Sequence, residues 1–274
     1  MIRLCILLKD RMFQADVADA QEGVVHTPLS TWEPARIANG VLSLPRGWQR
    51  EGDDAVSISL REESNHLLCC QETRAVLMIR DVPEGSMAVE TVGLLGRFTV
   101  GRSAQHHICC RENALSACHG VFSFTRSGQL RYEDASKNGT FVNDSLLWHD
   151  ARLLQPGDRL DFPPLMQVTV TGVGLQIRYP RNHGQLQLPP LPTATDGELL
   201  AAVYLPLQES LHYVSLPASL ADGASLLRCI LAQLPDEKAA LLPSAPLLRL
   251  AGDMTLISPM DPVRLRPDMT FHLS

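Results

Sequence analysis

Residues 134–143 read Asp134-Ala135-Ser136-Lys137-Asn138-Gly139-Thr140-Phe141-Val142-Asn143, and two shorter motifs precede them. Gly101-Arg102 follows an alternating run at 97–100, and Ser116-x-x-His119 comes next. Pro156-Gly157-Asp158 completes the set further along the chain. Asn138-Gly139 and Pro156-Gly157-Asp158 are turn signals, so we expect these motifs to lie in loops between short strands.

Alternating apolar and polar residues on both sides of these loops indicate β-strands. The alternation is clearest at 97–100, 121–124, 129–133 and 167–170. Many short strands separated by turn signals are typical of a β-sandwich. Residues 92–179 are therefore predicted to form one such domain.

Residues 1–91 show a similar succession of short strands and no helical period. Strand-like runs lie at 2–8, 12–17, 55–60 and 75–79. We therefore expect an all-β domain over 1–91, with the length and texture of the next domain but without its loop motifs.

Residues 180–197 are predicted to be a linker. Prolines at 180, 189, 190 and 192 lie there among Gln, Asn, Thr and Gly. Because proline fixes φ and lacks a backbone donor, such a composition favours a semi-extended chain.

Residues 198–274 form a last domain of mixed structure in this interpretation. A hairpin is predicted over 199–207 and 211–216, and Leu and Ile recur at helical spacing between 227 and 234. Asp222 or Ser225 is the candidate N-cap, and Pro235 the expected end of the helix. Short strands at 247–250 and 270–273 complete the order strand, strand, helix, strand, strand.

The composition limits the classes of function. The chain has 274 residues, 45% of them apolar and 20% charged, with a net charge of −6, as expected for a globular protein. No apolar stretch has the ~20 residues of a membrane helix, and we expect no leader peptide. The acidic balance argues against nucleic-acid binding, although Lys and Arg outnumber Asp and Glu in the middle third, where an anionic partner would be favoured. Seven cysteines without a Cys-x-x-Cys motif indicate a reducing, cytoplasmic location.

The ordered motifs over about 92–175 resemble the forkhead-associated (FHA) family, whose β-sandwich binds phosphothreonine peptides through its apical loops. The resemblance implies that Arg102 and Ser116 contact the phosphate, that Lys137 supplies a further donor, and that Asn138 bonds the ligand backbone. These residue types suit a dianion, because a guanidinium and a small hydroxyl are directional donors. Residues with a supporting role in this comparison are Gly101, His119, Gly139, Thr140 and Asn143.

Three positions depart from the family pattern and bear on which peptide would be preferred. Asp144 stands where a glycine usually follows the last asparagine, and Ala114 stands where a basic residue is frequent. His106-His107 precedes Ile108 where an acidic residue is common.

Two alternative interpretations, a catalytic site and a metal site, involve residues of the same region. Ser116 and His119 could form a nucleophile–base pair, but no third orienting group or Gly-x-Ser-x-Gly motif accompanies them. The remaining candidate is a metal cluster of His106, His107, Cys109, Cys110, Cys118 and His119. Its spacing fits no standard zinc site, and adjacent strand residues such as Cys109 and Cys110 point to opposite faces. We therefore expect no enzyme activity, no metal and no cofactor.

The flanking parts add two further resemblances. Residues 198–274 resemble the ubiquitin-like β-grasp family, and residues 1–91 resemble a degenerate FHA-like sandwich. The domain order resembles the cytosolic front end of an FtsK/SpoIIIE-type ATPase of type VII secretion. The chain is accordingly interpreted as mainly β, and as an adaptor for Thr-phosphorylated proteins downstream of a Ser/Thr kinase. The alternative is a phosphate-independent scaffold that contacts secretion components.

Overall fold

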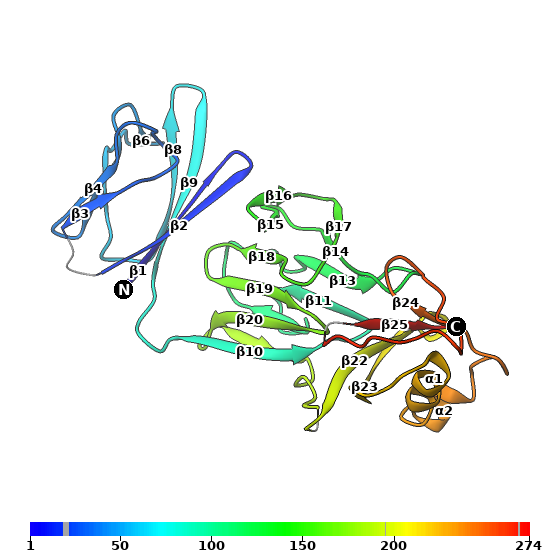
Figure 1. Cartoon of the computed structure of the whole chain (residues 1–274). Helices are drawn as coiled ribbons and strands as arrows, with labels where there is room; N and C mark the ends of the chain where they lie inside the picture. The colour runs from blue at the N-terminus through cyan, green and yellow to red at the C-terminus, as the bar shows by residue number, and fades with distance from the viewer. Residues whose placement is uncertain (19–21, 195, 268) are drawn as a thin grey trace.

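The computed structural model describes residues 1–18, 22–194, 196–267 and 269–274. The described chain is mainly β, and its strands form five sheets around three hydrophobic cores (Figure 1). Two β-sandwiches come first, and a smaller mixed α/β unit follows.

The N-terminal sandwich consists of a five-stranded sheet in the order β2-β1-β9-β8-β6 and a four-stranded sheet in the order β3-β4-β5-β7. Its strands are β1 Ile2–Leu8, β2 Arg11–Val17, β3 Gly23–Val25, β4 Ala35–Ala38, β5 Val41–Ser43, β6 Gln49–Arg50, β7 Ser57–Ser59, β8 Ser64–Cys70 and β9 Thr73–Asp81. Leu4 and Ile6 of β1 meet Leu42 and Ile58 in the core between the sheets. The alternate residues Arg3 and Cys5 are buried as well, so the other face of this sheet is also covered.

The second sandwich has two six-stranded sheets, in the orders β10-β20-β19-β18-β15-β16 and β17-β14-β13-β11-β12-β21. Its strands are β10 Met87–Gly93, β11 Arg97–Gly101, β12 Ile108–Cys110, β13 Gly120–Phe124, β14 Leu130–Asp134, β15 Thr140–Val142, β16 Ser145–Leu147, β17 Ala151–Leu153, β18 Arg159–Phe162, β19 Met166–Thr171, β20 Gly174–Pro180 and β21 Gly184–Leu186. Aromatic rings fill the core, with Phe98 and Phe122 stacked at 4.7 Å between centroids. The strands predicted around the loop motifs are confirmed.

Both boundaries of this sandwich differ from the boundaries predicted from the sequence. Strand β10 begins at Met87, before the expected start at 92, and its Ala88 lies in the core. The expected linker 180–197 is wrong at its beginning, because β21 pairs with β12 and Leu188 is a core residue. The alternation in Gln185-Leu186-Gln187-Leu188 carried this strand signal, and nearby prolines are compatible with an edge strand.

The C-terminal unit has a four-stranded sheet in the order β23-β22-β25-β24. Its elements are β22 Glu198–Leu205, the 3₁₀ turn η1 Pro206–Gln208, β23 Ser210–Pro217, α1 Gly223–Leu231, α2 Asp236–Ala239, β24 Leu248–Leu250 and β25 Thr270–Leu273. Strands β22 and β25 are parallel, and Leu226 and Ile230 of α1 pack in the core with sheet residues.

In this unit the structure selects one of the two predicted N-caps and ends the helix earlier than predicted. Asp222 is the N-cap of α1, because its side chain accepts a hydrogen bond from the Ser225 N–H at 2.8 Å. The helix ends at Leu231, four residues before Pro235, and the proline instead precedes α2, which was not predicted.

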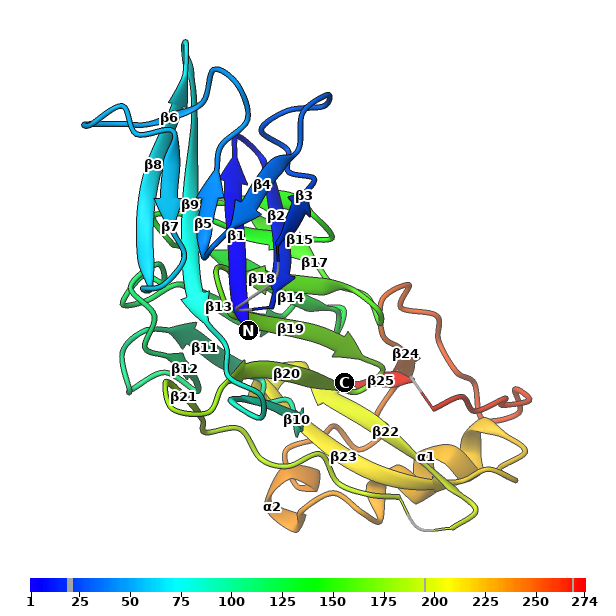
Figure 2. The same ribbon diagram turned by 90° about the vertical axis from the view of Figure 1, so that its left-hand side faces the viewer.

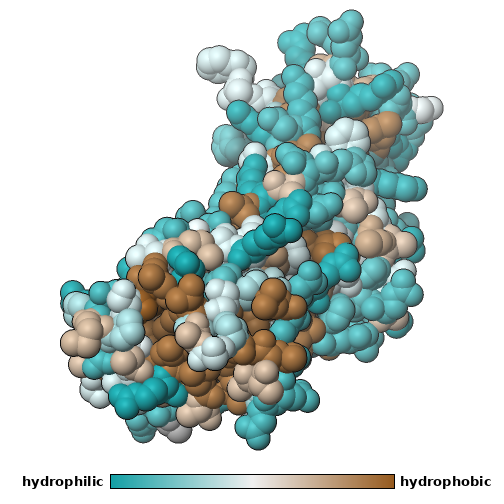
Figure 3. Space-filling model, turned by 90° about the vertical axis from the view of Figure 1, so that its right-hand side faces the viewer, coloured by the Kyte–Doolittle hydropathy of each residue, from teal (hydrophilic) through white to brown (hydrophobic). Residues whose placement is uncertain are grey.

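The C-terminal unit contacts the second sandwich directly. The Tyr213 hydroxyl donates to the Val173 carbonyl oxygen at 2.7 Å and accepts from the Leu94 N–H at 2.6 Å. Phe124 and Tyr204 stack across the same boundary at 5.1 Å. Figure 3 shows apolar side chains gathered on one face of the molecule, over this unit.

The N-terminal sandwich contacts the second sandwich on another side, and Figure 2 shows the lower end of β9 above β12 and β21. The Gln14 side-chain amide donates to the Pro164 carbonyl oxygen at 3.3 Å. In the described part of the chain, none of the helices has the length and apolar character required to cross a membrane.

Candidate functional site

Arg102 and Ser116 lie on adjacent loops of the second sandwich. Arg102 directly follows β11, and its backbone N–H donates to the Ser116 carbonyl oxygen at 2.9 Å. The Arg102 Nε donates to the Leu115 carbonyl oxygen at 3.2 Å, and the side chain is exposed. The guanidinium therefore lies beside the residue that precedes Ser116, with solvent access.

Gly101 allows these two loops to approach each other. A Cβ at this position would lie 2.4 Å from the Ala117 carbonyl oxygen and 2.7 Å from the His106 ring. Since such distances are far below van der Waals contact, any side chain at Gly101 would displace the loop that carries Ser116.

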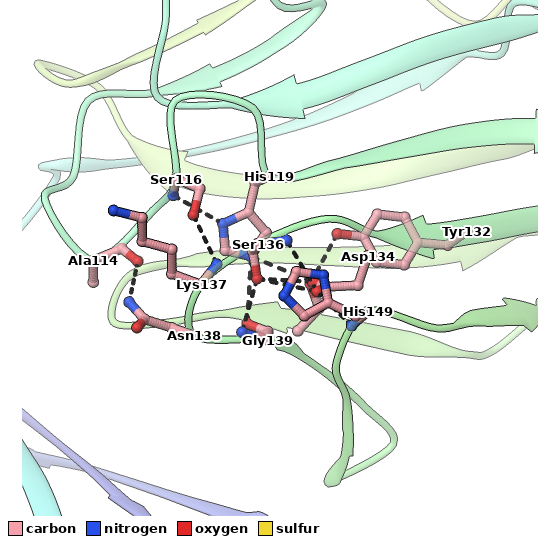
Figure 4. A network of polar contacts seen from close by, with 11 residues as sticks. Ala114, Ser116, His119, Tyr132, Asp134, Ser136, Lys137, Asn138, Gly139 and His149 are labelled. Atoms are coloured by element: carbon pink, nitrogen blue, oxygen red, sulfur yellow. Dashed lines mark hydrogen bonds and ion pairs between the residues drawn. The ribbon is translucent and has the colours of Figure 1, made fainter.

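A third loop, between β14 and β15, joins the same place. The Lys137 backbone N–H donates to Ser116 Oγ at 3.0 Å, and the Asn138 side-chain amide donates to the Ala114 carbonyl oxygen at 2.7 Å. Figure 4 shows Ser116, Lys137 and Asn138 together at the ends of these loops. The structure thus brings together the four residues that the sequence predicts to contact a ligand.

His119 supports this arrangement from below. It is buried, its Nδ1 accepts from the Ser116 N–H at 3.2 Å, and its Nε2 lies 3.3 Å from the Gly139 carbonyl oxygen. These partners require the neutral ring protonated at Nε2, which donates to Gly139. Burial lowers the pKa of His119 below its ordinary value, although Asp134 and the Gly139 carbonyl act in the opposite direction.

Asp134 is the centre of a buried network that the sequence analysis did not identify. Its carboxylate accepts from the Ser136 N–H at 3.1 Å, from the Ser136 hydroxyl at 3.0 Å and from the Thr140 hydroxyl at 2.8 Å. It also accepts from the His149 N–H at 3.2 Å, and Ser136 Oγ accepts from the Gly139 N–H at 2.7 Å. The short spacing Asp134-x-Ser136 was the available signal, because Asp side chains commonly bond the backbone two residues on.

Asn143 ties two neighbouring loops together. Its side-chain amide donates to Asp158 at 2.7 Å, and its Oδ1 accepts from the Arg159 N–H at 2.9 Å. The next residue, Asp144, has φ of +64°, the left-handed conformation that glycine adopts most readily. Asp144 tolerates this backbone and forms an ion pair with Arg159.

The nucleophile and metal alternatives find little geometric support. His119 bonds the backbone N–H of Ser116, and the Ser116 hydroxyl instead accepts from Lys137. Cys110 lies in the core, whereas Cys109 Sγ is 3.5 Å from the Arg102 carbonyl oxygen. Within the described ranges, no group of three or more His, Cys, Asp or Glu is placed to hold a metal ion.

Residues 98–163 match the family model of the FHA domain. The second sandwich therefore contains an FHA domain, a class of non-enzymatic interaction module that binds phosphothreonine peptides. No curated protein matches the chain in sequence.

Three solved structures show how the chain compares with known coordinates. The N-terminal FHA domain of EssC, a component of the bacterial type VII secretion apparatus, is 14% identical, with a TM-score of 0.48, over 70% of this chain and 99% of that one. The Slr1951 protein of Synechocystis sp. is 18% identical, with a TM-score of 0.25, over 34% and 96%. The N-terminal FHA domain of Saccharomyces cerevisiae Rad53p, in complex with a phosphothreonine peptide, is 23% identical, with a TM-score of 0.23, over 38% and 85%.

Proposed function

We propose that the second sandwich binds a phosphothreonine peptide at Arg102, Ser116, Lys137 and Asn138, and that the chain is an adaptor acting downstream of a Ser/Thr kinase in the cytoplasm. The convergence of three loops supports this proposal. Two hydrogen bonds join these loops. The Lys137 N–H donates to Ser116 Oγ at 3.0 Å, and the Asn138 side-chain amide donates to the Ala114 carbonyl oxygen at 2.7 Å.

The donors left available at this place suit a phosphate dianion. The Ser116 hydroxyl accepts from Lys137, so its own proton is free to be donated to a ligand. The terminal guanidinium nitrogens of Arg102 have no hydrogen-bond partner in the described part of the chain. Charge-assisted hydrogen bonds from such groups are about twice as strong as neutral ones.

Asn138 would recognise the peptide itself. Its Nδ2 bonds Ala114, which leaves the amide oxygen and one N–H to face a ligand. An amide can bond a peptide main chain of any sequence, so this contact would fix the ligand without selecting its side chains.

Calorimetry with a degenerate phosphothreonine peptide library, against the same library without phosphate, tests the proposal. We expect binding only by the phosphorylated library. Arg102→Ala and Ser116→Ala should each weaken it by about 1.5–3 kcal/mol, the usual worth of a hydrogen bond to a charged group. Equal binding of both libraries would refute phosphate recognition.

Arg97→Ala provides a matched control for Arg102→Ala. Arg97 is an exposed arginine at the first position of β11, whereas Arg102 follows the last position of the same strand. Removing Arg97 changes the net charge by the same amount but leaves the loop end intact. We expect its affinity to equal that of the unaltered protein.

The second candidate function is a phosphate-independent scaffold in a type VII secretion assembly. The contacts that join the sandwich to both flanking units favour this alternative, because they suit a multidomain architectural piece. We propose, in addition, that the C-terminal unit is a β-grasp domain. Its sheet order, with the first and last strands parallel and adjacent at the centre, supports that proposal.

The N-terminal sandwich is proposed to be a degenerate FHA-like domain. In both sandwiches the first strand pairs antiparallel with a strand close to the end of the domain, β1 with β9 and β10 with β20. The N-terminal sandwich lacks a counterpart of the Arg102 and Ser116 motifs in its sequence.

A further inference from the structure

A buried ion pair joins the N-terminal sandwich to the loop that carries Ser116. Arg80 Nε of β9 donates to Glu112 Oε2 at 3.2 Å, and each side chain is only 6% exposed. Charged side chains are rarely buried so deeply unless they are paired. The contact is therefore a fixed feature of the boundary and not a loose surface pair.

Arg80 is held firmly on its own side of the boundary. Its Nη1 donates to the Ile79 carbonyl oxygen at 2.8 Å and to the Ser64 carbonyl oxygen at 3.2 Å. Both acceptors lie at one end of the β8–β9 pairing inside the N-terminal sheet, where Ser64 and Ile79 are register partners. The position of the guanidinium, and with it that of the Glu112 carboxylate, is therefore fixed by the N-terminal sheet.

Glu112 begins the turn that leads to the ligand-binding residues. Its carbonyl oxygen accepts from the Leu115 N–H at 3.0 Å, and Leu115 is 1% exposed. The Leu115 carbonyl oxygen accepts from Arg102 Nε at 3.2 Å. The Ala114 carbonyl oxygen, in the same turn, accepts from Asn138 at 2.7 Å.

A third segment closes around the same carboxylate. His183 Nδ1 lies 3.4 Å from Glu112 Oε1, and the His183 carbonyl oxygen accepts from the Arg111 N–H at 2.7 Å. Figure 2 shows the lower end of β9 above the paired strands β12 and β21. The carboxylate of Glu112 is therefore the point where the N-terminal sheet, the turn 112–115 and the segment before β21 meet.

We propose that Arg80 and Glu112 are positioning residues of the phosphopeptide site, so that the N-terminal sandwich is a working part of that site. The pair holds the turn 112–115 in the conformation that presents the Arg102 guanidinium, Ser116 and Asn138 to one ligand. This inference rests on the function proposed above, and it assigns to the N-terminal sandwich the task of organising a loop in its neighbour.

The test uses Glu112→Gln in the full chain. Glutamine keeps the shape of the side chain but leaves the Arg80 cation without its counter-charge. We expect the Kd for a phosphothreonine peptide to rise roughly 2- to 30-fold, the range found for residues that influence a site through intervening contacts. We also expect faster hydrogen exchange of the amides in 112–119, measured by mass spectrometry without ligand.

Arg3→Met is the matched control. Arg3 is a nearly buried arginine of the same sheet, 6% exposed, and it pairs with Asp16 through two contacts of 2.7 Å. Within the described residues, none of its hydrogen bonds reaches the Ser116 loop. It should lower the stability of the same sandwich while leaving the Kd and the exchange of 112–119 unchanged. Arg80→Lys, which retains the positive charge, should lie closer to the unaltered protein than Glu112→Gln does.

The outcomes separate this inference from the proposed function. Unchanged exchange and unchanged affinity in Glu112→Gln would overturn the inference, as would an equal loss of affinity in Arg3→Met. If the unaltered chain binds no phosphopeptide, the proposed function fails. Hydrogen exchange then still decides whether Arg80 and Glu112 hold the turn.

Discussion

The Asn138 side-chain amide donates a hydrogen bond to the Ala114 carbonyl oxygen at 2.7 Å. The two residues are 24 positions apart in sequence and lie on different loops. Asn138→Ala removes this bond together with the amide proposed to bind the peptide main chain. Because Asn138 is exposed, we expect a loss of about 1–2 kcal/mol in phosphopeptide affinity with little change in thermal stability. Calorimetry and thermal unfolding measure the two quantities.

Gln176→Ala is the control for this change. Gln176 is an exposed amide in the middle of β20, and its side chain makes no hydrogen bond within the described residues. Its removal should alter neither quantity. A normal affinity in Asn138→Ala would show that the amide is not part of the binding surface.

Asp134→Asn tests the network beneath the loops. The carboxylate accepts hydrogen bonds from Ser136, Thr140 and the His149 N–H, and it is 3% exposed. An amide in its place sets an N–H₂ against these donors, so we expect the free energy of unfolding to fall by about 2–3 kcal/mol. Chemical denaturation followed by circular dichroism measures this difference.

Glu133→Gln serves as the neighbouring comparison. The Glu133 side chain is 54% exposed and pairs with Arg131 at the surface, where ion pairs contribute little. Its stability should stay within about 0.5 kcal/mol of the unaltered protein. A similarly small effect in Asp134→Asn would contradict a structural role for the network.

The sequence predicted the loop motifs well, because each residue type there has a restricted set of uses. Gly101, Asn138 and Gly139 all lie where a close approach or a turn requires them, and Gly139 has φ of +80°. The alternating runs also located most of the strands of the second sandwich. These signals are local, so a single sequence was sufficient to interpret them.

Features that depend on tertiary contacts could not be predicted. Arg80 and Glu112 are 32 positions apart, and either would ordinarily be interpreted as a solvated surface charge. The strand at 184–186 was hidden by prolines that follow it, since proline-rich composition usually indicates a linker. For Asp134 the spacing to Ser136 indicates only a local hydrogen bond, and the fold alone shows that the carboxylate is buried among four donors.

The neutral state of His119 predicts a pH dependence of stability. Burial lowers the pKa of His119 below its ordinary value of 6.5, so the unfolded chain binds this proton more readily than the folded one. The stabilising contribution is complete above pH 6.5 and is lost as the pH falls from 6.5 toward the pKa of the folded state. Protonation of Nδ1 would also remove the acceptor of the Ser116 N–H.

The measurement compares the unaltered protein with His119→Gln between pH 7.5 and 5. Burial also lowers the pKa of His66, His212 and His272, so only the difference between the two proteins reports on His119. We expect the unaltered protein to lose stability more steeply on acidification. Parallel curves would contradict the assigned protonation state.

Gly96→Ala tests the contact between the second sandwich and the C-terminal unit. A Cβ at Gly96 would lie 1.8 Å from the Glu209 carbonyl oxygen, a backbone atom that cannot move away independently. We therefore expect the two units to shift or separate, with a loss of about 1–3 kcal/mol in stability, as is usual for overpacking. Limited proteolysis of the connecting segment 191–197 and small-angle scattering should detect the change.

Gly23→Ala is the matched control, because no atom of the described residues, its two chain neighbours aside, lies within 4 Å of the position that a Cβ would take there. The two substitutions add the same methyl group, one into a closed contact and one into open space. Phosphopeptide affinity should survive in both, since Gly96 precedes the start of β11 and Arg102 follows its end. A stable, protease-resistant Gly96→Ala protein would mean that the contact at Gly96 is not needed to hold the two units together. The contacts of Tyr213 and the Phe124–Tyr204 stack would then hold them without it.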